Sequence, residues 1–81
     1  MNDNQLWGKL SGSFRSVFER DNITVVPSTT AADIAEWDSL NHVSLILAVE
    51  SDFGIRFKHA EVASFENVGD MMGAIKRHLH L

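Results

Sequence analysis

The sequence has no cysteine, a single proline and no long apolar run. The absence of cysteine excludes disulfides and thiolate metal sites, and it is compatible with a reducing compartment. No apolar run approaches the roughly 20 residues that a membrane span requires. Residues 1–5 are polar and lack the cationic start and apolar stretch of a secretion signal. We therefore expect a soluble, cytoplasmic protein that does not insert into membranes.

Basic residues are also few, and the seven of them stand against eleven acidic residues to give a net charge of −4. This balance disfavours nonspecific nucleic-acid binding, which requires a basic surface. It suits partners with basic docking patches, although ordinary solubility explains it equally well. With 81 residues and no internal repeat, the chain has room for one domain, residues 1–81, which we expect to be monomeric.

Apolar periodicity predicts a first helix over about residues 3–20. Its stripe is Leu6, Leu10, Phe14, Val17 and Phe18. Ser13 falls off this stripe and is expected on the outer face. A long connection follows over residues 21–38, with a single helical turn near residues 31–34. We expect Ile34 and Trp37 to hold this connection on the bundle as apolar plugs.

A second helix is predicted from about residue 39 to residue 52. Asp38 is suited to be its N-cap, because a carboxylate can accept a hydrogen bond from the free amides of the first turn. Ser39 then lies in the first turn with its hydroxyl in water, and the partial positive charge of a helix N-terminus would tolerate a phosphate there. Steps of three and four residues place an apolar row on the inward face, namely Leu40, Val43 and Leu47, with Ile46 and Val49 just off that row. Leu45 lies off this face and is expected to be exposed.

The sequence after the second helix predicts two further helices. Gly54 is suited to end the second helix in a left-handed conformation. A short third helix over about residues 58–63 precedes a final helix that Asn67 caps. The fold class is therefore all-α: a four-helix bundle with a long loop between helices 1 and 2 and a short third helix.

The segment Asp38-Ser39-Leu40 resembles the attachment motif of the acyl carrier protein family. The residues that extend the resemblance are Val43, Leu47, Glu50, Phe53, Gly54 and Ile55. The tripeptide alone is common, but here it opens a helix that ends in Phe-Gly-Ile in a chain of suitable length. The resemblance, which runs from about residue 34 to residue 79, implies the acyl-carrier-protein-like bundle. It also implies that Ser39 carries covalent 4'-phosphopantetheine from coenzyme A.

The resemblance further implies a freestanding carrier that is not an enzyme. It would hold acyl intermediates as thioesters and shuttle them between enzymes of fatty-acid, lipid or polyketide-type synthesis. Its partners would be a phosphopantetheinyl transferase and the enzymes that load and transfer acyl groups. Asp38 would help the transferase recognise the site and hold the metal-bound coenzyme A, in addition to capping the helix. Leu40 would serve partly in the core and partly in recognition.

In this family the second helix is the main docking surface, and it is usually acidic. The docking candidates here are Trp37, Asn41, His42, Ser44 and Leu45. Asn41 and Ser44 stand where carboxylates are common, which indicates a specialised carrier with weaker attraction to basic patches. Trp37 has a second interpretation as a structural plug. His42 is also compatible with a position beside the arm or with a solvated place on the helix.

Two alternatives remain open at this stage. An aminoacyl or peptidyl carrier would use the same serine with a different cargo. An unmodified helical interaction module would keep the fold without the chemistry. A catalytic serine is excluded, because no base, orienting group and oxyanion loop surround Ser39. His78 and His80 alone make a poor metal site, so no metal is predicted.

Overall fold

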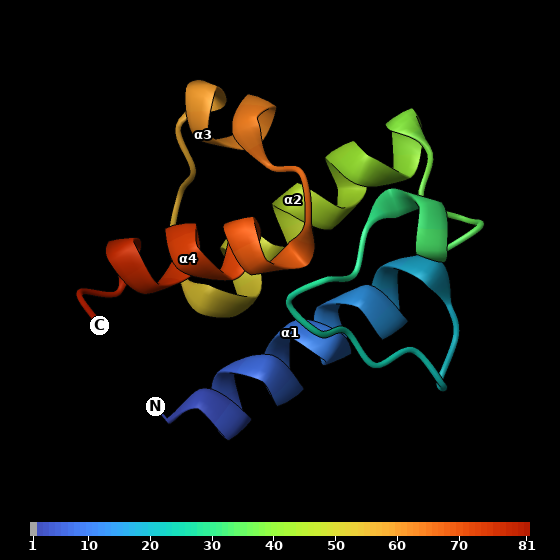
Figure 1. Ribbon diagram of the computed structural model, residues 1–81, viewed down its shortest axis with the longest axis horizontal. Coiled ribbons are helices and arrows are strands. Elements are labelled where there is room, and N and C mark those ends of the chain that lie inside the picture. The colour runs from blue at the N-terminus through green and yellow to red at the C-terminus, as the bar shows by residue number, and fades with distance from the viewer. Residues whose placement is uncertain (1) are drawn as a thin grey trace.

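The computed structural model describes residues 2–81, which form four α-helices and one short 3₁₀ turn (Figure 1). The elements are α1 (Asp3–Phe18), η1 (Ala31–Asp33), α2 (Ser39–Phe53), α3 (His59–Ser64) and α4 (Val68–His78). No strand occurs within these residues. The predicted all-α fold, with its long loop after the first helix and its short third helix, is therefore confirmed.

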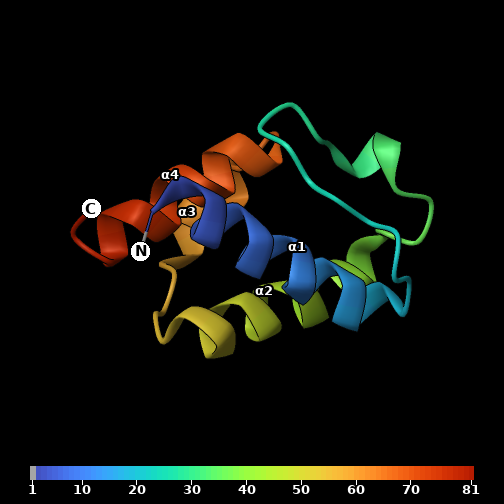
Figure 2. The same ribbon diagram turned by 90° about the horizontal axis from the view of Figure 1, so that it is seen from below.

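Helices α1 and α2 run side by side in opposite directions, and α4 lies across them (Figures 1 and 2). The buried side of α1 repeats every four residues, through Leu6, Leu10, Phe14 and Phe18. This is the stripe that the sequence predicts. Ser13, expected on the outer face, is instead buried and donates a hydrogen bond to the carboxylate of Asp52 on α2.

The prediction for the inward face of α2 is wrong for its main row and for Leu45, although Val49, expected just off that row, is buried. The helix buries Leu45, Val49 and Phe53, and Leu45 has no exposed surface. Leu40, Val43 and Leu47 retain 77%, 57% and 61% of their exposure. The reason is that apolar residues surround most of this helix, so both rows have helical spacing. Packing against α1 and the rest of the bundle, which periodicity does not encode, selects the row through Leu45.

The connection between α1 and α2 is anchored at several points along its length. The guanidinium of Arg15 donates to the carbonyl of Ile23 at 2.6 Å, and the hydroxyl of Ser11 accepts the amide of Val25 at 3.1 Å. Further on, the amides of Val68 and Gly69 donate to the carbonyls of Thr29 and Pro27 at 2.8 and 2.9 Å. The buried apolar side chains of the connection are Ile23, Val25 and Ile34. The loop is thus tied both to α1 and to the start of α4.

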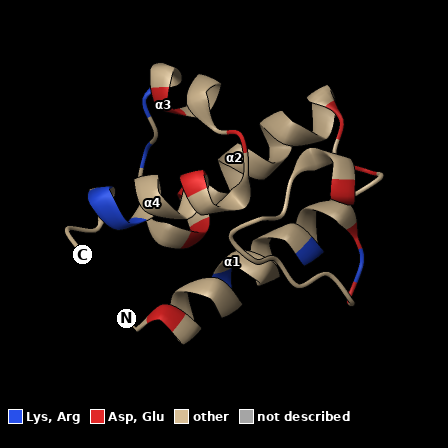
Figure 3. Cartoon of the chain, in the orientation of Figure 1, with Lys and Arg blue, Asp and Glu red and all other residues tan. Residues whose placement is uncertain are grey.

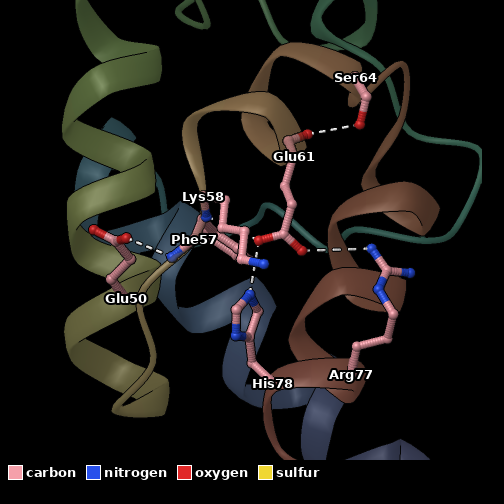
Figure 4. A network of polar contacts seen from close by, with 7 residues as sticks. All are labelled: Glu50, Phe57, Lys58, Glu61, Ser64, Arg77 and His78. Carbon is pink, nitrogen blue, oxygen red and sulfur yellow. Dashed lines mark hydrogen bonds and ion pairs between the residues drawn. The ribbon is translucent and has the colours of Figure 1, made fainter.

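A polar network joins α3 to α4 through Glu61 (Figure 4). One carboxylate oxygen accepts the amide of Lys58 and lies 2.8 Å from Nε2 of His78, while the other lies 3.6 Å from Nη2 of Arg77. The hydrogen bond from Lys58, followed by the contact with His78, lowers the pKa of Glu61 below its ordinary value of 4.5. The ionised carboxylate therefore stabilises the docking of α3 on α4.

Replacement of Glu61 is expected to give a pH-dependent loss of stability. Because the folded-state pKa is lowered, the carboxylate contributes stability above its unfolded-state pKa, and this contribution disappears as the pH falls through the folded value. Glu61→Gln should therefore lower the Tm at pH 7, and the difference from the wild type should shrink as the pH falls below 4.5 and vanish below the lowered folded-state pKa. Thermal melts by circular dichroism at several pH values measure both quantities.

Glu66→Gln provides the control, because Glu66 is exposed and its side chain has no recorded partner among residues 2–81. This variant should match the wild type across the whole pH range. A Tm difference for Glu61→Gln that persists unchanged at low pH would contradict the assigned role of the charge.

Candidate functional site

Ser39 is the first residue of α2, and its side chain is exposed. Asp38 precedes it in an extended conformation, and Oδ1 of Asp38 accepts the amide of Asn41 at 2.8 Å. The carbonyl of Asp38 accepts the amide of His42 at 2.8 Å and starts the helical ladder. Asp38 is therefore the N-cap, as the sequence predicts. No hydrogen bond recorded within residues 2–81 engages the hydroxyl of Ser39, which is free to react.

Two hydrogen bonds and an ion pair stabilise the turn before Ser39. The amide of Trp37 donates to the carbonyl of Ile34 at 3.1 Å, and Nδ2 of Asn41 donates to the carbonyl of Glu36 at 2.8 Å. The carboxylate of Glu36 forms an ion pair with Arg20 at 3.0 Å. Although the serine is exposed, its backbone position is fixed by these contacts.

Trp37 is half-buried and packs against the core. Its ring meets Phe14 of α1 edge to face at a centroid distance of 5.2 Å, and Phe18 lies 6.3 Å away. On the other side, Nε1 of Trp37 donates a hydrogen bond to Nδ1 of His42 at 2.9 Å. Of the two interpretations of Trp37, the structure therefore favours the plug. His42 is bonded and half-buried, so it is not a solvated helix residue.

An open groove of about 490 Å³ lies beside Ser39, between the start of α2 and the link that leads from α3 into α4. Its apolar and aromatic walls include Trp37, His42, Phe65 and Met71, and Ser39 lines one edge. The sequence did not reveal this groove, because Phe65 and Met71 are far from Ser39 along the chain. Only the tertiary packing of α4 brings them together.

The predicted docking residues do not form one surface. The prediction that Leu45 is exposed and contacts partners is wrong, because its side chain is fully buried. Asn41 is half-buried and bonded to the preceding turn, whereas Ser44 is exposed. The exposed apolar residues of α2 are instead Leu40, Val43 and Leu47, which we name the apolar stripe.

The apolar stripe starts next to Ser39 and continues along a part of α2 that has no charged residue. The prediction that Leu40 serves partly in the core is wrong, because more than three quarters of its surface is exposed. No Asp, Glu, Lys or Arg occurs between Asp38 and Glu50. Figure 3 shows the acidic and basic residues gathered on other segments, while most of α2 carries neither. The sequence does not indicate which of the two apolar rows of α2 faces solvent.

A solved structure decides the family. The solution structure of a holo acyl carrier protein from Geobacter metallireducens superimposes with a TM-score of 0.86. It is 36% identical in sequence, and the match covers 93% of this chain and 86% of that one. This chain belongs to the acyl carrier protein family. Acyl carrier proteins are carriers without catalytic activity, so the chain is a carrier and not an enzyme.

Two curated acyl carrier proteins are also similar in sequence. The protein of Lactobacillus acidophilus is 27% identical over 78 residues, which cover 96% of this chain and 98% of that protein. The protein of Thermosynechococcus vestitus is 29% identical over 75 residues, which cover 93% of each chain. No family model matches the sequence.

The part of the chain that the structure describes has neither a metal-binding cluster nor a helix that could span a membrane. Within residues 2–81, no three His, Cys, Asp or Glu side chains are grouped so that they could bind a metal ion. No helix in the same range has the length and apolar character needed to cross a membrane.

Proposed function

We propose that Ser39 carries 4'-phosphopantetheine and that the chain delivers acyl groups bound to this arm as thioesters. The observation that supports the proposal is the exposed hydroxyl at the start of a capped helix, which makes no recorded hydrogen bond within residues 2–81. The arm would supply a thiol to which the acyl group is attached. Tethering raises the effective concentration of the cargo near each successive enzyme.

The surroundings of Ser39 fit such an arm. The helix N-terminus favours the negative charge of a phosphate, and the hydrogen bonds of the preceding turn hold the attachment point in place. The groove of about 490 Å³ at the edge of Ser39 offers apolar surface to the part of the arm or cargo that folds back. Met71, which lines this groove, is adaptable in shape.

The apolar stripe is the surface through which we expect partner enzymes to approach the arm. Leu40, Val43 and Leu47 are exposed on the helix that Ser39 starts, so an enzyme that reaches the arm passes close to them. The lack of charge along this stretch reduces long-range attraction to basic patches. This supports a specialised carrier in fatty-acid, lipid or polyketide-type synthesis, with partners that recognise apolar side chains.

Incubation with coenzyme A and a phosphopantetheinyl transferase tests the attachment site. The wild type should gain the mass of one arm, and Ser39→Ala should gain none, as measured by intact-protein mass spectrometry. Ser44→Ala is the matched control, because Ser44 is another exposed serine on α2 and should not affect the reaction. Arm transfer to Ser39→Ala, or no transfer to the wild type by several transferases, would refute the proposal.

Two variants of Asp38 separate its role as a cap from its role in recognition. Asp38→Ala removes the cap and should lower the free energy of unfolding by about 0.5–2 kcal/mol. Asp38→Asn preserves an equally good cap, so its stability should remain close to that of the wild type. If the carboxylate helps the transferase, Asp38→Asn should still be modified more slowly. Normal modification rates in Asp38→Asn would leave Asp38 with the capping role alone.

A further inference from the structure

His42 and Ser39 lie on the same side of α2. Residues three apart on a helix are neighbours, with roughly 5–6 Å between their Cβ atoms. Helical side chains also lean toward the N-terminus, so His42 leans back over the first turn, where Ser39 lies. Both residues line the groove at the start of α2. A group attached to the hydroxyl of Ser39 therefore starts within reach of the His42 ring.

The bond from Trp37 determines which nitrogen of His42 carries the proton. Indole Nε1 is a donor only, so Nδ1 of His42 must accept the 2.9 Å hydrogen bond and cannot itself be protonated. In a neutral imidazole the proton then lies on Nε2. Trp37 is held in turn by its edge-to-face contact with Phe14 of the core. The core thereby fixes both the tautomer and the orientation of the His42 ring.

The Nε2–H group of His42 has no recorded acceptor within residues 2–81. The acidic residues that line the groove are Asp38 and Glu66, and the carboxylate of Asp38 is already bonded to the amide of Asn41. Among residues 2–81, no lysine or arginine lines the groove. An anion attached to Ser39 would therefore find no cationic side chain in the groove, but it would find an oriented and unused donor.

We propose that Nε2–H of His42 donates a hydrogen bond to the phosphate of the arm on Ser39, with Trp37 as the residue that positions His42. The inference rests on the proposed function of Ser39. It assigns His42 to holding the first segment of the arm, instead of contacting a partner enzyme. His42, held by Trp37, thereby limits the directions in which the arm can extend from α2.

The first part of the test uses the protein without the arm. Long-range ¹H–¹⁵N spectra at about pH 8, where histidine in model peptides is neutral, distinguish the two tautomers. We expect His42 to be protonated on Nε2 and its Nδ1 to accept a hydrogen bond. Trp37→Phe keeps an aromatic ring but has no indole N–H, so the Nδ1 resonance of His42 should shift in this variant as the hydrogen bond is lost. A His42 protonated on Nδ1 would overturn the proposal before any arm is attached.

The second part compares the protein with and without the arm. Attachment should shift the Nε2 resonance of His42 more than those of the other three histidines. The ³¹P resonance of the phosphodiester should move in His42→Ala and in Trp37→Phe but remain in place in His59→Ala, whose exposed histidine lies on α3. A residue with a purely structural role would leave the ³¹P signal unchanged.

The outcomes separate the two proposals. An arm that attaches normally but leaves the His42 and ³¹P signals unaffected would refute the role of His42 alone. Failure of any arm to attach to the wild type would refute both this inference and the proposed function. If His42→Ala unfolds, the ¹⁵N shift in the wild-type protein still decides the question, because it requires no substitution.

Discussion

Leu45→Ala is expected to lower the free energy of unfolding by about 2–5 kcal/mol, whereas Leu47→Ala should change it by less than about 0.5 kcal/mol. The two leucines are two residues apart on α2 and differ in environment. Leu45 is fully buried, and its truncation leaves a cavity in addition to the lost transfer energy. Leu47 is 61% exposed, so little contact is lost. Urea melts of both variants measure the difference.

This pair is informative because both substitutions remove the same atoms from the same helix. Helix propensity therefore changes equally in both variants, and only burial differs. Because small domains have only about 5–15 kcal/mol of stability, Leu45→Ala could unfold a substantial part of the molecules. A larger loss for Leu47→Ala than for Leu45→Ala would mean that α2 is rotated about its axis relative to the structure.

The same pair illustrates what the sequence of α2 leaves undetermined. Along α1, polar residues flank a single apolar row, so the prediction of Leu6, Leu10, Phe14 and Phe18 as buried is confirmed. Along α2, uncharged residues occupy every position from Ser39 to Val49. Two rows then fit the helical period equally well. Only the packing of α1 on α2 determines which row is buried and which faces solvent.

The ends of the helices were predictable from single residues. Asp38 and Asn67 cap α2 and α4 as expected, because short polar side chains bond to free amides close in sequence. Gly54 ends α2 with φ of 66°, in the left-handed region that glycine adopts at low cost. These features depend on contacts within about four residues. The start of α2, and with it the exposed position of Ser39, followed from such local chemistry.

The surroundings of Ser39 were less predictable, because they depend on distant contacts. The sequence identified Trp37 and His42 as notable, but it did not indicate that their rings are hydrogen-bonded to one another. That bond requires Trp37 to rest on Phe14, which is more than 20 residues earlier in the chain. The groove likewise requires Phe65 and Met71 to approach α2. Local pattern thus locates the candidate serine, while tertiary packing determines its neighbours.

Gly69→Ala is expected to lower the free energy of unfolding by about 1–3 kcal/mol, even though alanine favours helices. A Cβ atom on Gly69 would lie 2.9 Å from the carbonyl oxygen of Pro27, and that oxygen is part of the backbone and cannot move alone. The same carbonyl accepts the amide of Gly69, and the neighbouring amide of Val68 bonds to Thr29. Moving α4 away would therefore weaken both bonds that tie the connection to this helix.

Gly73→Ala is the matched control, since Gly73 lies one turn further along α4. The nearest atom to its added Cβ would be the flexible end of Arg77 at 3.6 Å, an ordinary contact. This variant should gain up to about 1 kcal/mol from helix propensity. Urea melts measure the change in the free energy of unfolding for each variant. A decrease for Gly69→Ala and an increase for Gly73→Ala would show that the close approach of the connection makes Gly69 necessary. If both substitutions stabilised the protein equally, the connection would not pack closely against the start of α4.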